Sequence, residues 1–188
     1  MKEELRDLLA RRQKRQVAEP RRIPSAVLVP LRQRQERYYL LFIRRTLTVK
    51  THKGQISFPG GTWETTDGSL LHTALRECDE EIGLKPADAE VLGELDDELT
   101  ATSNYVVTPY VAMIPGEYEF TLNADEVAEL IEVPLAALLE ENRRIPPVRD
   151  AARELLQAYT YHYDSRVIWG ATARILRHFL NLLEPPRD

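Results

Sequence analysis

The sequence predicts a single domain of the α/β class, in which helices cover a mixed β-sheet. Apolar, β-prone runs of strand length recur along the chain, and one strongly amphipathic helical segment at residues 69–84 interrupts them. A second apolar stripe of helical spacing follows residue 170. With 188 residues and neither repeats nor a low-complexity linker, the chain is long enough to bury one core.

Composition and charge narrow the class of protein. Hydrophobic residues make up 43% of the chain, as in globular proteins, and a net charge of −5 argues against a nucleic-acid binder. The one cysteine, Cys78, excludes an internal disulfide and is compatible with a reducing compartment. No apolar run approaches the ~20 residues of a membrane span, and Arg11-Arg12 directly follows Leu8-Leu9-Ala10, so a signal peptide is not expected. We therefore expect a cytoplasmic protein without a membrane or nucleic-acid partner.

Residues 1–22 are predicted to form an amphipathic helical arm, with the helix over residues 2–17, and residues 23–188 to form the main domain. The arm is basic at residues 11–15, which could attract anions. A solvated helix or an arm packed on the domain is the favoured interpretation. The apolar contacts of this helix are Leu5, Leu8 and Leu9.

The domain is predicted to begin with a hairpin, 26–31 and 38–43, around a polar turn. Pro109 indicates an edge strand or a bulge in the strand 105–114, and Pro134 opens a short helix at 135–141. Residues 151–158 allow one or two helical turns. The other predicted strands are 56–58, 89–95, 130–133, and a second hairpin of 160–163 and 166–169.

The helical segment at 69–84 has two unlike faces. Its acidic face carries Glu77, Glu80 and Glu81, and Gly83 ends the helix as a left-handed cap. The apolar stripe that would pack on the core consists of Leu71, Leu75, Cys78 and Ile82.

The acidic face is unfavourable for an isolated helix. Glu77 and Glu81 are like charges one turn apart, and they lie in the C-terminal half, where the helix dipole disfavours negative charge. A bound divalent cation would offset both the repulsion between the glutamates and the unfavourable interaction with the helix dipole. The alternative is an acidic face that is simply solvated. Glu77 and Glu81 can reach one ion, Glu80 the same ion or a second, and a carbonyl of the Gly60-Gly61 loop could add a ligand.

The stretch from Gly61 to Leu84 resembles the Nudix box, G-x5-E-x7-R-E-U-x-E-E-x-G-U, where U is aliphatic. Residues 76–84 match its second half. In the first half Asp67 stands at the glutamate position, and eight residues rather than seven separate it from Arg76. This insertion, preceded by Ser-Phe-Pro-Gly-Gly at 57–61, resembles the coenzyme A pyrophosphatase branch of the family.

A second motif of that branch, approximately L-L-T-x-R-[S/A]-x3-R followed by a glycine and F-P-G-G, is similar to the segment before the box. Arg45-Thr46 and Lys50 stand at its basic positions, and Ile43 replaces the threonine. Gly54 and the Phe-Pro-Gly-Gly run align directly. The run at 168–173 also resembles this branch.

The resemblance implies a Nudix-type α/β/α sandwich around a mixed sheet. It implies hydrolysis of the diphosphate bond of coenzyme A or its derivatives by attack of water at phosphorus, giving 3′,5′-ADP and 4′-phosphopantetheine or its acyl form. The alternatives are another nucleoside diphosphate derivative, such as ADP-ribose, or a non-catalytic ligand-binding Nudix domain. The partner is thus a coenzyme A-like nucleotide, and a homodimer is left open.

The resemblance also implies roles for individual residues. The ligands of Mg²⁺ or Mn²⁺ would be Glu77 and Glu81, with Glu80 as a further one. Arg76 would orient a carboxylate of the box through a salt bridge, and Asp67 would support the loop. The general base would be Glu80 or Glu126, with Glu126 favoured, although it could equally be a charge at a helix entry. The catalytic set is therefore Glu80, Glu81, Glu126 and Arg76, and the substrate contacts are Arg44, Arg45, Lys50, Gly60 and Gly61.

The remaining candidates are weaker. His52 and His72 have no partner at metal-ligand spacing and are interpreted as ordinary polar residues. Cys78 lies on the apolar stripe and is expected in the core. Trp63 and Trp169 could stack on a base, but aromatic side chains are more often buried.

Overall fold

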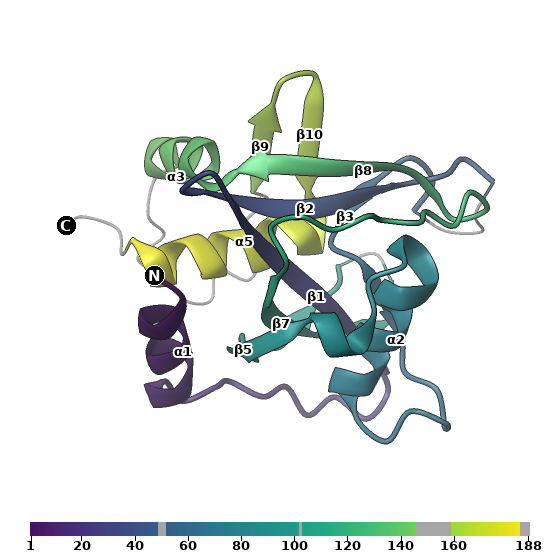
Figure 1. The fold of residues 1–188 in the computed structure, drawn as a ribbon. Helices are drawn as coiled ribbons and strands as arrows, with labels where there is room; N and C mark the ends of the chain where they lie inside the picture. The colour runs from purple at the N-terminus through teal and green to yellow at the C-terminus, as the bar shows by residue number, and fades with distance from the viewer. Residues whose placement is uncertain (49–51, 102, 146–158, 185–188) are drawn as a thin grey trace.

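The computed structural model describes residues 1–48, 52–101, 103–145 and 159–184 (Figure 1). The helices are α1 (Lys2–Arg11), α2 (Leu70–Ile82), a 3₁₀ helix (Pro86–Asp88), α3 (Leu135–Arg144) and α5 (Gly170–Leu183). The strands are β1 (Ile23–Arg34), β2 (Arg37–Arg45), β3 (Ile56–Ser57), β4 (Gly60–Thr62), β5 (Glu90–Glu94), β6 (Glu98–Leu99), β7 (Tyr105–Ile114), β8 (Val127–Pro134), β9 (Thr160–Tyr163) and β10 (Arg166–Trp169).

The main sheet is mixed, as predicted. Its central order is β3-β2-β1-β7-β5; in addition β4 pairs with β1, β6 with β7 and β8 with β2. β1 and β2 form the predicted antiparallel hairpin, whereas β1 and β7 run parallel with Val27 opposite Pro109. The second predicted hairpin is also present, because β9 and β10 pair antiparallel.

Helices cover both faces of this sheet, so the predicted α/β/α sandwich is confirmed (Figure 1). Successive residues of a strand point to opposite faces. In β1, Val29 joins the larger core beneath α1, α3 and α5, while Leu28 joins the smaller core beneath α2. In β2, Phe42 joins the larger core and Ile43 joins the smaller core.

The helix α2 is defined by its caps. The Ser69 hydroxyl accepts a hydrogen bond from the backbone N–H of His72 (3.2 Å), and Gly83 adopts the left-handed conformation predicted for it (φ 71°). Cys78 and Ile82 are fully buried, as expected from the apolar stripe. Leu71 and Leu75 are only partly buried, whereas Thr73 and Ala74 are fully buried.

The N-terminal helix is shorter than predicted, since α1 ends at Arg11 and not at residue 17. Leu5 and Leu9 are buried in the larger core, whereas Leu8 is 37% exposed. The residues after α1 are held by carboxylates of the domain: Lys14 pairs with Glu94 and Asp97, and Arg12 with Asp96. The backbone N–H groups of Arg15 and Val17 donate to Asp96 and Asp97 and not to carbonyls one helical turn back, so the basic cluster belongs to a packed arm.

Other details differ from the sequence prediction. β7 is an interior strand, so Pro109 does not mark an edge; it lies where the antiparallel partner of β7 changes from β5 to β6. α3 begins at Leu135 directly after Pro134, as predicted, but it continues to Arg144 and not only to residue 141. β4 and β6 were not predicted, and residues 151–158 lie outside the described part of the chain. None of the helices that the structure describes has the length and apolar character needed to cross a membrane.

Candidate active site

The loop before α2 approaches that helix closely because it contains two adjacent glycines. In β4, Gly60 pairs with Val27 and Gly61 with Ala26. A Cβ atom on Gly60 would lie 2.3 Å from the carbonyl oxygen of Ala26. A Cβ atom on Gly61 would lie 2.4 Å from the carboxyl carbon of Glu77. Backbone atoms exclude any side chain at Gly60, and a side chain at Gly61 would displace the end of Glu77, so the acidic face of α2 is in direct contact with β4.

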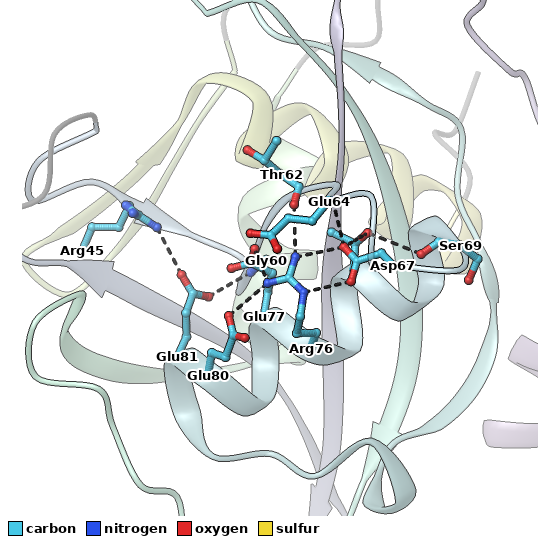
Figure 2. Close-up of polar contacts among 11 residues, drawn as sticks. Arg45, Gly60, Thr62, Glu64, Asp67, Ser69, Arg76, Glu77, Glu80 and Glu81 are labelled. Atoms are coloured by element: carbon cyan, nitrogen blue, oxygen red, sulfur yellow. Dashed lines mark hydrogen bonds and ion pairs between the residues drawn. The ribbon is translucent and has the colours of Figure 1, made fainter.

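Glu81 lies at the centre of this contact, and its side chain is 1% exposed. The backbone N–H of Gly60 donates to one carboxylate oxygen (2.9 Å), and Arg45 donates to the other (3.1 Å; Figure 2). Burial raises the pKa of Glu81 to about 8, against the opposing effect of these two donors. The charges of Glu77 and Glu126 raise this pKa further.

Arg76 connects the glycine loop to the acidic face of α2 (Figure 2). Its guanidinium donates to both oxygens of Asp67 (2.9 and 3.0 Å) and to one oxygen each of Glu77 and Glu80 (3.0 Å). It also donates to the carbonyl of Thr62 on β4 (3.2 Å). This geometry is the one expected of a residue that orients carboxylates of the box.

Asp67 is held by hydrogen bonds from three residues. Besides Arg76, the Thr73 hydroxyl (2.9 Å) and the backbone N–H of Glu64 (3.0 Å) donate to it. The Arg76 hydrogen bonds hold the pKa of Asp67 far below its usual range, although burial opposes them. All of these bonds lie within the loop and α2, so Asp67 supports the loop geometry.

Glu77 and Glu80 are held less tightly. The Glu77 side chain is 15% exposed, and burial raises its pKa despite the neighbouring Arg76. The Glu80 side chain is 56% exposed and faces solvent apart from its bond to Arg76. Glu126 lies close enough for its charge to raise the pKa of both Glu77 and Glu81. Its backbone is fixed by Thr46, whose N–H donates to the Glu126 carbonyl (2.9 Å).

The cationic residues before the loop separate in the structure. Arg45 reaches Glu81, whereas Arg44 pairs with Glu129 on β8 (2.9 Å) and not with the box helix. The structure therefore brings Arg45, Gly60 and Gly61 together with the glutamates and leaves Arg44 apart. Lys50 lies outside the described residues.

Among the weaker candidates, the cysteine is buried, whereas the tryptophans are exposed. Cys78 is fully buried, as expected, and burial raises the pKa of its thiol. His72 is exposed, and the ring of His52 hydrogen-bonds Gln55 (2.8 Å). The expectation that the two tryptophans are buried was wrong: Trp63 is 37% and Trp169 is 48% exposed.

A cavity of about 270 Å³ opens beside the glycine loop. Arg45 and residues 60–62 line one side, and the wall continues through apolar side chains such as Phe58 and Val107. Trp169 and the first turn of α5 also line the cavity. Sequence reasoning missed Thr100, Tyr105 and Arg174 as cavity residues; the one signal toward this region was the resemblance at 168–173.

The carboxylates fit a divalent cation without forming a finished cage. Within residues 1–48, 52–101, 103–145 and 159–184, no three acidic, histidine or cysteine side chains converge as a metal centre. Mg²⁺ commonly binds one or two carboxylates and completes its shell with water and substrate phosphate oxygens. Glu77 and Glu81 supply such a pair: both are desolvated, and a nearby cation would favour their ionised forms.

Known proteins match most of this chain in sequence. A family model described as the NUDIX domain matches residues 22–180. An "Uncharacterized Nudix hydrolase NudL" from Yersinia pestis is 40% identical over 156 residues, which cover 82% of this chain and 76% of the relative. A protein of the same name from Pectobacterium atrosepticum is 39% identical over 137 residues, 73% of this chain and 71% of the relative.

Two solved structures share the fold of this chain at low sequence identity. A MutT/nudix family protein from Enterococcus faecalis superposes with a TM-score of 0.56 at 15% identity, over 97% of this chain and 69% of that chain. The NUDIX domain of NrtR from Shewanella oneidensis, solved in complex with ADP ribose, has a TM-score of 0.51 at 21% identity, over 72% of this chain and 84% of that chain.

The mixed sheet between helices, with glutamates of one helix packed under a glycine loop, agrees with the family model and both relatives, which support a hydrolase of the pyrophosphatase class. By the family model and by its similarity to both relatives, the chain belongs to the Nudix hydrolase family.

Proposed function

We propose that this pyrophosphatase hydrolyses the diphosphate bond of coenzyme A or its derivatives with Mg²⁺ or Mn²⁺. The observation that carries the reaction is the position of Glu81, buried between the Gly60 N–H and Arg45 and one turn from Glu77. Two desolvated carboxylates beside a cationic side chain and a glycine loop suit a cation and an anionic diphosphate together.

Glu77 and Glu81 are the proposed metal ligands, and Glu80 is a further one that would have to turn from Arg76. When bound, the cation polarises a phosphoryl oxygen and lowers the pKa of a coordinated water. Arg76 keeps Glu77 directed toward the loop, and Arg45 holds Glu81 while presenting positive charge to the cavity.

The general base is proposed to be Glu126. A base must come within hydrogen-bond reach of the attacking water. The charge of Glu126 raises the pKa of both Glu77 and Glu81, which supports a carboxylate on the same side of the site as the proposed metal ligands. Glu80, the other candidate, already binds Arg76 and is more than half exposed. Glu126 would accept the proton as water attacks phosphorus.

The substrate proposal rests on the motifs around residues 45–61 and 168–173. Both runs contribute to the cavity wall, so the residues that resemble the coenzyme A branch surround the space next to the proposed metal ligands. ADP-ribose is the alternative, because the similar NUDIX domain of NrtR was solved with that ligand. A diphosphate that links adenosine to a second group is common to both substrates.

Turnover of coenzyme A, dephospho-coenzyme A and ADP-ribose at equal concentration with Mg²⁺ tests the substrate proposal. Mass spectrometry should identify 3′,5′-ADP and 4′-phosphopantetheine, and kcat/KM should be highest for coenzyme A. A higher kcat/KM for either compound that lacks the 3′-phosphate would contradict coenzyme A as the substrate while leaving the reaction intact. The cytoplasmic location and a homodimer remain predictions.

A further inference from the structure

The cavity beside the glycine loop is bounded by two walls from distant parts of the chain. One wall follows β6 directly and includes Thr100, Ser103 and Tyr105. The other is the start of α5, from Trp169 through Ile175. Because both segments line the cavity, their relative position affects the space beside the proposed diphosphate site.

Arg174 joins the two walls. It belongs to α5 and itself lines the cavity, but its guanidinium is directed to β6. Its Nε donates to Glu98 (2.5 Å) and its Nη2 donates to the carbonyl of Leu99 (2.7 Å). The two side chains of the ion pair are only 12% and 14% exposed. One residue therefore connects the first turns of α5 to the strand that directly precedes the other wall.

β6 is fixed from its other side by the N-terminal arm. The residue before it, Asp97, pairs with Lys14 (3.0 Å) and accepts hydrogen bonds from the Val17 N–H (3.0 Å) and the Thr108 hydroxyl (2.7 Å). Because Asp97 anchors β6 to the arm and to β7, the Arg174 contacts decide how far β6 lies from α5.

The ion pair between Arg174 and Glu98 is not expected to contribute much to the stability of the fold. Burial raises the pKa of Glu98 although Arg174 opposes the shift, which means that its charge has lost much of its solvation. A buried ion pair contributes little net stability compared with apolar residues of the same volume, because desolvation offsets the attraction. What the pair supplies is a defined geometry, with two directed bonds between two elements.

We propose that Arg174 is a positioning residue that sets the width of the cavity and, through it, the affinity for the substrate. The inference rests on the proposed function in one respect, namely that the diphosphate binds at Glu77 and Glu81. Arg174 does not act on the reacting atoms, so its effect falls on KM and not on kcat.

The test compares Arg174→Met and Arg174→Lys with Arg143→Met. Arg143 makes a matched ion pair with Glu184 at the other end of α5 (2.8 and 2.7 Å), but that pair is exposed and away from the cavity. Arg174→Met should raise KM at least about tenfold and leave kcat within about twofold, because both bonds between the walls are lost. Arg174→Lys, which keeps the charge but not the fork, should be intermediate, and Arg143→Met should match the wild type.

KM is measured with whichever member of the substrate panel the wild type hydrolyses, so failure with coenzyme A alone counts against the proposed substrate and not against this inference. Urea unfolding of each variant separates loss of fold from loss of affinity, and Arg174→Lys carries the test if Arg174→Met does not fold. An unchanged KM in the Arg174 variants, or a loss confined to kcat, would overturn the proposal. Absence of turnover with every member of the panel would overturn the proposed function as well.

Discussion

The carboxyl carbon of Glu77 lies 2.4 Å from the position that a Cβ atom on Gly61 would take. A side chain of any size at residue 61 must therefore displace Glu77, one of the two proposed metal ligands. The site therefore requires glycine at residue 61 to keep the Glu77 carboxylate in this position.

Gly61→Ala should lower kcat by about 100-fold, since a displacement on the order of 1 Å at a catalytic group has that effect. Steady-state kinetics with Mg²⁺ measures it. Gly68→Ala is the matched control in the same loop, because the nearest atom to its Cβ is in the His72 ring at 3.3 Å and that exposed side chain can move. Equal activities of the two variants would show that the close approach of Gly61 is unimportant.

Asp67→Asn should destabilise the fold by roughly 2–3 kcal/mol, because Arg76 would lose its ionic partner within the loop. Urea unfolding at pH 7 measures the difference. Because Asp67 supports the loop without being a proposed ligand, the variant that remains folded should keep the same metal requirement.

The same substitution predicts a dependence on pH. The folded-state pKa of Asp67 is lowered, mainly by its bonds to Arg76, so its contribution to stability is present above the unfolded pKa of about 3.9. That contribution is lost as the pH falls toward the folded pKa. The difference in unfolding free energy between wild type and Asp67→Asn should be constant above about pH 5 and shrink below about pH 4. A difference that grows on acidification would contradict this assignment.

The N-terminal arm should contribute to the stability of the domain. Leu5→Ala removes a side chain that is 1% exposed and should lower the unfolding free energy by about 3 kcal/mol. Leu8→Ala, on the same helix but 37% exposed, is the control and should change it by less than about 1 kcal/mol. If both substitutions have the same small effect, α1 is not part of the core in solution.

Glu126→Gln should lower kcat by about 100-fold or more with little change in KM, as expected for loss of a general base. Glu80→Gln should cost less, because that carboxylate is more exposed and already bonded to Arg76. The order of the two kcat values decides between the candidates. A larger loss in Glu80→Gln would assign the base to α2.

The sequence predicted elements that local pattern alone determines. The β1–β2 hairpin, β7 and α2 with its Gly83 cap follow from apolar alternation, helical spacing and turn residues. The extent of α1 could not be predicted, because residues after Arg11 form ion pairs with Asp96 and Asp97, which are far away in the sequence.

The same limit applies to the site. The glutamates and glycines could be found because they lie within one short motif. The separation of Arg44 from Arg45 depends on Glu129 of β8, and the cavity depends on α5 meeting β6, so neither follows from local sequence. Trp169 was expected in the core because aromatic residues usually are, but it lies at this cavity.

The central claim is that Glu81 helps to hold the cation that hydrolyses the diphosphate. Its most direct test is the kcat of Glu81→Gln for coenzyme A across a titration of Mg²⁺, with Asp79→Asn as the control on the same helix, where Asp79 pairs with Lys85 instead (2.7 Å). Loss of an outer partner of a metal ligand alone costs about 10–100-fold, so kcat of Glu81→Gln should fall by more than about 100-fold at every Mg²⁺ concentration. The control should keep wild-type turnover. Undiminished, Mg²⁺-dependent turnover in Glu81→Gln would contradict the account.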